Sequence, residues 1–296
     1  MRASGQHLYA ANPAAGRIDV FNNTFTQVTV PGGFSDPTPL PAKEFPFNVA
    51  NIDGHLYVSY TGPAGSVGVV NEFDTEGRFI RRFATGGTLL DPWGMVVAPP
   101  VFGKFANALL VGNFNAGNAA NGPGNISAFD LKTREFLGLL KGTDSGPLQI
   151  DGLWQLIFGN GVAGGNAGVL YFSAGINKQN EGLFGSLATC HGPVISGASA
   201  SPNVLWPPNH KSVTVAIDYS APDDCDAAPV CTLSVTNNET GPNDATVVNA
   251  HTVDLIATRE GKGDGRLYTV EISCKDKLPL SSSTSVTVTV PHDQAH

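Results

Sequence analysis

The residues best suited to chemistry are amide and carboxylate side chains at the starts of expected strands. Asn48 opens "NVANI" and Asp151 precedes "GLWQL". Asp91, in "DPWGM", is a third candidate, although the proline after it also suits an ordinary turn. Asn113, in "VGNF", follows a strand and is a weaker one. If these oxygen atoms converge, they offer the ligands that Ca²⁺ prefers.

Proton transfer has one candidate, His55, which heads the stretch "HLYVSY". The motifs G-x-S-x-G, H-E-x-x-H and G-x-x-x-x-G-K-[ST] are absent from the sequence. A water molecule activated by a metal needs no protein nucleophile, so a cation and one histidine could suffice for hydrolysis. The simpler interpretation of His55 is a polar turn residue.

Four similar stretches supply the elements that would position these side chains. Tyr9, Tyr57, Leu110 and Tyr171 head equivalent strands, at spacings of 48, 53 and 61 residues, and each strand runs into a Gly/Asn-rich hairpin and a second strand. A repeat of this length made only of strands and turns is typical of β-propeller blades. We therefore expect an all-β fold with a partial or small β-propeller of about four blades in residues 1–189. The alternative is an ordinary sandwich.

A propeller would bring the candidate ligands together, because its innermost strands line a central channel. Asn48 and Asp151 begin such strands and would point at the axis from different directions. Both residues also have a simpler interpretation, since "FN" and "DG" are common at strand edges.

The phrases "FPFNVANIDGHLYVSY", "DPWGMVVAPPVFGKFANALLVGNF" and "IDGLWQLIFGNG" resemble the C-terminal part of a secreted bacterial six-bladed propeller family. More distantly, Asn48 and Asp151 look similar to the strand starts of gluconolactonase and paraoxonase-like propellers, where such segments hold an axial calcium. The resemblance implies a secreted, calcium-dependent hydrolase of lactones or esters, with acyl-homoserine lactones as one substrate class. In the six-bladed family an upstream segment supplies the other blades. The blades here could therefore form a four-bladed ring or an open arc, or a homodimer could complete the ring.

A second domain follows a linker rich in small residues. We place the linker at 190–203 and an immunoglobulin-like β-sandwich at 204–296, where apolar and polar residues alternate, as in "SVTVAIDY". The phrases "LWPPNHK" and "GRLYTVEISCKD" resemble bacterial Ig-like modules, which are usually spacers or adhesion units. This resemblance implies the alternative function, a non-catalytic extracellular module that binds a glycan or a protein.

An acidic loop in this domain offers another cation site. The loop "APDDCDAAP" contains Asp223, Asp224 and Asp226, and Asp276 follows a strand that could end nearby. Clustered carboxylates repel one another unless a cation lies among them. A solvated acidic loop is the equally simple interpretation.

All four cysteines lie at or beyond residue 190, which predicts disulfides and an oxidising compartment. Four cysteines allow three sets of pairs. We expect Cys231–Cys274 to join two sheets and Cys190–Cys225 to fix the entrance of the second domain.

Composition limits the partners and the location. Only 14% of residues are charged and the formal net charge is −8, so a nucleic acid partner is not expected. The sequence contains no apolar run of about 18 residues that would span a membrane. The N-terminus "MRASGQHLYAAN" lacks the apolar core of a signal peptide, so any export signal lies outside this chain. We nevertheless expect an extracellular or periplasmic protein.

Overall fold

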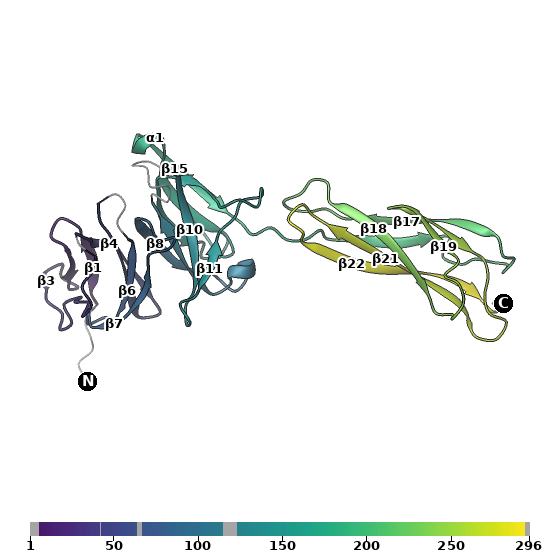
Figure 1. Cartoon of the computed structure of the whole chain (residues 1–296), viewed down its shortest axis with the longest axis horizontal. Coiled ribbons are helices and arrows are strands. Elements are labelled where there is room, and N and C mark those ends of the chain that lie inside the picture. The colour runs from purple at the N-terminus through teal and green to yellow at the C-terminus, as the bar shows by residue number, and fades with distance from the viewer. Residues whose placement is uncertain (1–5, 42, 64–66, 115–122, 294–296) are drawn as a thin grey trace. The chain divides into compact units, whose positions relative to one another are not determined.

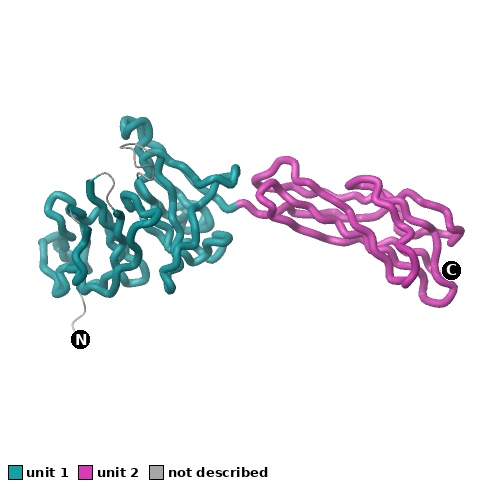
Figure 2. Tube along the Cα trace, in the orientation of Figure 1, with its two compact units in different colours: residues 1–189 teal, residues 190–296 magenta. Residues whose placement is uncertain are grey.

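The computed structural model describes residues 6–41, 43–63, 67–114 and 123–293. The chain divides into two compact units, residues 1–189 and 190–296 (Figure 2). The fold is all-β, and its helical elements within the described ranges are one short 3-10 turn (Gly103–Phe105) and α1 (Ile176–Gln179). Within those same ranges, no helix has the length and apolar character needed to cross a membrane.

The described residues of the first unit form four antiparallel sheets that follow one another along the chain (Figure 1). Their strands are β1 (Leu8–Asn12), β2 (Arg17–Phe21) and β3 (Gln27–Val28); β4 (Phe45–Ile52), β5 (His55–Thr61), β6 (Val69–Phe73) and β7 (Phe79–Thr85); β8 (Pro92–Val97), β9 (Ala108–Asn113), β10 (Pro123–Asp130) and β11 (Phe136–Leu139), with β12 (Ile150–Asp151) beside β10; and β13 (Leu153–Phe158), β14 (Leu170–Gly175) and β15 (Glu181–Leu187).

Apolar side chains fill three interfaces between successive sheets. Val58 of β5 packs toward the first sheet, whereas its neighbour Tyr57 packs toward the third. Likewise, Leu109 of β9 packs toward the second sheet and Leu110 toward the fourth. Because successive side chains of a strand point to opposite faces, a strand between two interfaces must be apolar on both. This explains why all six residues of β9 are buried.

The first strands of the second, third and fourth sheets lie side by side, because β8 contacts both β4 and β13. Each of these three strands also holds one extra residue near its start, a β-bulge. The pairing register shifts between Pro46 and Asn48, between Pro92 and Met95, and between Leu153 and Leu156. Bulges redirect side chains at sheet edges and near binding sites. The three equivalent bulges therefore redirect side chains at the same end of all three strands.

A glycine permits the close approach of β8 and β13. A Cβ atom on Gly94 would lie 2.7 Å from the backbone oxygen of Trp154 and 2.8 Å from the nitrogen of Leu156. Both neighbours are backbone atoms, so a larger residue would push the two strands apart.

The second unit consists of two sheets packed face to face on one core. One sheet contains β16 (Ser196–Ser201), β17 (Ser212–Ser220), β20 (Thr252–Ile256) and β19 (Ala245–Asn249), and the other contains β18 (Val230–Asn237), β21 (Gly265–Lys275) and β22 (Ser281–Pro291).

The predicted linker at 190–203 is wrong, because β16 within it pairs with β17. Ala198 and Ala200 pack against the core, and serines alternate with them on the exposed face. Small residues in alternation thus form an edge strand here.

The structure contains the disulfides Cys190–Cys225 and Cys231–Cys274. Cys231 on β18 lies directly opposite Cys274 on β21, in neighbouring strands of one sheet. The expectation that this bond crosses between two sheets is therefore wrong.

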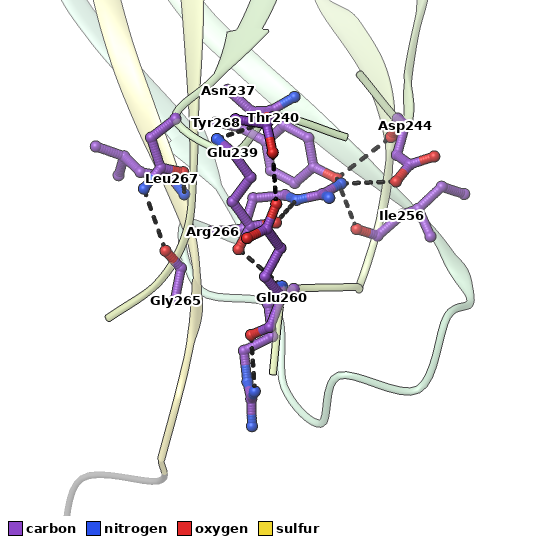
Figure 3. Close-up of polar contacts among 12 residues, drawn as sticks. Asn237, Glu239, Thr240, Asp244, Ile256, Glu260, Gly265, Arg266, Leu267 and Tyr268 are labelled. Carbon is purple, nitrogen blue, oxygen red and sulfur yellow. Dashed lines mark hydrogen bonds and ion pairs between the residues drawn. The ribbon is translucent and has the colours of Figure 1, made fainter. Parts of the chain in front are cut away.

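A buried ion pair lies among the polar contacts near the start of β21 (Figure 3). Arg266, whose side chain is 4% exposed, donates to Glu239 at 2.6 Å and to Asp244 at 2.7 Å. The Tyr268 hydroxyl donates to the carbonyl oxygen of Ile256 at 2.8 Å. The guanidinium and phenol thus tie the loop after β18 to β20 and β21.

Candidate binding site

Four aromatic side chains meet at the bulged ends of the three neighbouring strands. We call this set, Phe47, Trp93, Phe114 and Trp154, the aromatic array. The rings of Trp93 and Trp154 are stacked, with centroids 4.8 Å apart and planes 18° apart. The Phe47 ring lies 4.0 Å from that of Trp93, and Phe114 lies within 6.4 Å of both tryptophans. Trp154 is 37% exposed and the other three are half-buried.

The array follows from a short pattern in the sequence. "PFNV", "PWGM" and "LWQL" each place an aromatic residue second, and that residue lies within each of the three bulges. In β13 the bulge leaves two consecutive residues, Trp154 and Gln155, exposed between the buried Leu153 and Leu156. A regular strand would turn one of the two into the core. The bulge therefore exposes the ring beside an amide group.

Asn48 connects all three strands at this point. Its Nδ2 donates to the carbonyl oxygen of Trp93 at 2.8 Å and lies 3.5 Å from Oε1 of Gln155. Its Oδ1 accepts a hydrogen bond from the backbone nitrogen of Val49 at 2.8 Å. Residues 107 positions apart in the sequence thus share one site.

The other expected calcium ligands of the first unit lie at the same strand ends, and two of the three are engaged by protein groups. Asp91, directly before β8, accepts a hydrogen bond from the Thr61 hydroxyl. Asn113 pairs with Pro92, and its fully buried side chain bonds to Leu90, Asn125 and Ser127. Asp151 is half-buried in β12. In the described part of the chain, no group of three or more His, Cys, Asp or Glu residues is arranged to hold a metal ion.

His55 lies at the other end of the β4–β5 hairpin. It pairs with Ile52, four residues along β4 from Asn48, which corresponds to about 13 Å. The structure therefore does not bring His55 together with Asn48.

His55 instead lines a separate cavity of about 370 Å³, with Tyr57, Glu72, Arg81 and Lys132 among its other lining residues. The buried carboxylate of Glu72 contacts His55 Nδ1 at 2.5 Å and accepts from Arg81 Nε at 2.6 Å. Burial, together with the charge of Glu72, raises the pKa of Tyr57 to about 12, so its hydroxyl stays protonated at neutral pH.

Glu44, directly before β4, is not among the site residues predicted from the sequence. Both of its carboxylate oxygens are buried and lack a hydrogen-bond partner among the described residues. Burial raises the pKa of Glu44 to about 7, against the opposing effect of Arg82. The sequence signal is "EFPFN", which places an acidic residue at a strand start, as Asp151 is.

The four aspartates predicted as cation ligands in the second unit lie in two segments that meet. The backbone nitrogen of Lys277 donates to Asp226 Oδ2 at 3.0 Å, joining the loop of Asp223, Asp224 and Asp226 to the turn that begins at Asp276. Asp224 bonds to His191 at 2.7 Å, and this hydrogen bond lowers the pKa of the carboxyl.

No protein-family model matches the sequence. The chain is 33% identical over 196 residues to uncharacterized protein L690 and 31% identical over 203 residues to uncharacterized protein R648, both of Acanthamoeba polyphaga mimivirus. The alignments cover 61% and 63% of this chain and 48% and 47% of the relatives. The chain thus spans about half the length of the curated relatives it matches.

Among solved structures, the extracellular domain of a one component system protein of B. thetaiotaomicron matches with a TM-score of 0.35 and 12% identity. That match covers 96% of this chain and 34% of the other. An S-layer protein matches with a TM-score of 0.25 and 9% identity, covering 98% of this chain and 40% of the other.

Proposed function

We propose that this chain is a non-catalytic extracellular binding module that recognises carbohydrate through the aromatic array. The observation that carries the proposal is the threefold repetition of one device. Three neighbouring strands each place an aromatic residue in a bulge at the same end. A core needs no such bulges, because regular alternation already buries one face of a strand.

The surface of the array suits a sugar ring. A pyranose has apolar C–H groups on its faces and hydroxyl groups around its edge, so it combines with a flat aromatic ring and neighbouring amides. Trp154 supplies an exposed ring. The Gln155 side chain, next along the strand, lies with its Oε1 3.5 Å from Asn48 Nδ2, and the Ser173 hydroxyl accepts a hydrogen bond from the backbone nitrogen of Gln155 at 3.4 Å. Amide and hydroxyl groups can both donate to and accept from sugar hydroxyls.

The proposed architecture supports a binding site at the aromatic array. We interpret the four sheets of residues 1–189 as blades of a partial propeller and residues 190–296 as an Ig-like sandwich. Asn48 bonds to two further sheets, as expected where innermost strands converge on an axis.

Two disulfides favour an extracellular or periplasmic location. A second copy of the chain could complete the ring.

Intrinsic fluorescence offers a direct test. The chain has three tryptophans, so the variant Trp206→Phe retains only the two in the array. Titrating this variant with soluble β-glucans, α-glucans, mannans and chitooligosaccharides should give a saturable change in emission with at least one of them. Trp154→Ala in the otherwise unchanged chain should weaken binding of that glycan about tenfold or more, measured by calorimetry.

Trp206→Ala is the matched control, because Trp206 is 42% exposed and lies in the other unit. It should leave the affinity unchanged. If no glycan in the panel alters the emission, or if Trp154→Ala binds as tightly as Trp206→Ala, the proposal fails.

A second candidate function is a hydrolase of lactones or esters, with acyl-homoserine lactones as one substrate class. The contact of His55 with the buried Glu72 in the cavity favours it, since a carboxylate orients a histidine that acts as a general base. This function predicts turnover of γ-lactones that is lost in His55→Ala. If Ca²⁺ held by Asn48 and Asp151 takes part, EGTA and Asp151→Ala should abolish turnover as well.

A further inference from the structure

Among the described residues of the second unit, two carboxylate oxygens are buried without a hydrogen-bond partner. Asp276 is 6% exposed, and its Oδ1 accepts from the backbone nitrogens of Leu278 and Leu280 at 2.8 and 2.7 Å. Asp223 Oδ1 likewise accepts from the backbone of Cys225 and Asp226, at 2.8 and 2.6 Å. The remaining Oδ2 of each residue is buried and has no hydrogen-bond partner among the described residues.

The segments that carry these two oxygens are fastened together. The bond from Lys277 to Asp226 joins the two segments directly. A third segment, residues 190–193, closes the same corner through the Cys190–Cys225 disulfide and the hydrogen bond from the Ser282 hydroxyl to the carbonyl oxygen of Pro193. The corner therefore consists of three chain segments held at fixed positions.

Unpaired buried carboxylates are unfavourable. Taking a charged group out of water without a partner is unfavourable, so buried charges are normally paired or coordinate a metal ion. Within the described chain, no ion pair includes Asp223 or Asp276. The nearest lysines in sequence, Lys275 and Lys277, are exposed.

We propose that Asp223 and Asp276 bind one Ca²⁺ ion through these Oδ2 atoms. Two carboxylates balance the charge of the ion, and backbone carbonyl oxygens and water would complete its shell. Ca²⁺ accepts such irregular oxygen shells, whereas Mg²⁺ demands near-octahedral geometry and retains several waters, which a buried corner cannot easily hold. The other two aspartates are otherwise engaged, since Asp224 pairs with His191 and Asp226 bonds to the backbone of Ala228 and Lys277.

The test is calorimetric titration of the full chain with CaCl₂ after removal of metal by a chelator, combined with thermal unfolding. Wild type should bind one Ca²⁺ and melt at a higher temperature in its presence. Asp276→Asn and Asp223→Asn should each weaken Ca²⁺ binding tenfold or more. Asp224→Asn is the matched control from the same loop, and its affinity should equal that of wild type.

Three results would overturn the proposal. The first is a wild-type chain that releases no binding heat and melts at the same temperature with Ca²⁺. The second is a Ca²⁺ affinity that neither Asp276→Asn nor Asp223→Asn changes. If only one of these variants folds, an unchanged Ca²⁺ affinity in that variant is enough. The third is Mg²⁺ binding as tight as Ca²⁺ binding, which would refute the calcium assignment.

Discussion

The two units bury their strands in opposite ways. In the first, β9 and β6 are buried along their whole length, because sheets pack on both of their faces. In the second, β17 and β21 alternate between buried and exposed residues, because each sheet has one covered face. The first unit therefore has its core in three separate layers, and the second has one core shared by two sheets.

This difference affects where polar side chains can lie. A strand covered on both faces has no exposed face for polar side chains. In the first unit, several polar side chains within strands are therefore buried and bonded to protein groups, as Glu72 is, and others lie at strand ends, as Asn48 and Asp91 do. The second unit can carry polar residues along every strand, yet it buries one arginine fully. Substitutions in the two units should therefore differ in size and in cause.

The largest effect is expected at the buried arginine of the second unit. Arg266→Met would leave Glu239, 8% exposed, without its partner, so the free energy of unfolding should fall by about 3–5 kcal/mol. Urea denaturation would measure the loss. Because the unpaired carboxylate is the main cost, adding Glu239→Gln should recover part of it.

Arg78→Met in the first unit is the control. Arg78 is 57% exposed and pairs with Asp74, so its replacement should cost no more than about 1 kcal/mol. Equal losses at the two arginines would remove the contrast between buried and surface charge.

The next effect is expected in the layered core. Leu110→Ala removes a fully buried side chain and opens a cavity between the third and fourth sheets. The free energy of unfolding should therefore fall by about 2–5 kcal/mol. Leu137→Ala, at a residue that is 43% exposed, should change stability by less than about 0.5 kcal/mol in the same urea experiment. A loss at Leu110 as small as that at Leu137 would contradict the layered core.

The smallest effect depends on pH. The folded chain holds the pKa of Glu44 at about 7, above the ordinary 4.5, so it binds more protons than the unfolded chain between these values. The stability that Glu44 contributes is complete below pH 4.5 and is lost as pH rises through 7. Glu44→Gln should thus exceed wild type by up to about 3 kcal/mol at pH 8 and match it at pH 4. If the variant and wild type have the same free energy of unfolding at pH 4 and also at pH 8, Glu44 is not held neutral by the fold.

Several features of the fold could be predicted from the sequence. The repeated "LYV" strands indicated four units, and the structure has four successive sheets in residues 1–189. Local patterns sufficed there because each strand carries its own turn and apolar run. The segment 190–203 was misjudged because Ser and Ala are typical both of linkers and of exposed edge strands.

The candidate site was harder to predict. The oxygen atoms of Asn48 and Asp151 point to a cation, whereas the aromatic array involves Phe47 and Trp154, one and three residues away from them. An aromatic residue near a strand start usually belongs to the core, and one extra residue in the pairing decides whether it does. A bulge depends on the partner strand, so a single strand's sequence does not reveal it. Comparison of "PFNV", "PWGM" and "LWQL" would have indicated the array.

The disulfide at the start of the second unit has a mechanical consequence. Cys190 is the first residue of that unit and is bonded to Cys225. A pulling force that enters the unit at residue 190 passes through the sulfur atoms, so the segment between the two cysteines, which includes β16 and β17, carries no tension. About 120 Å of chain is thereby withheld from extension. Reduction of this bond would transfer the load to the hydrogen bonds between β16 and β17. The two strands could then separate one hydrogen bond at a time.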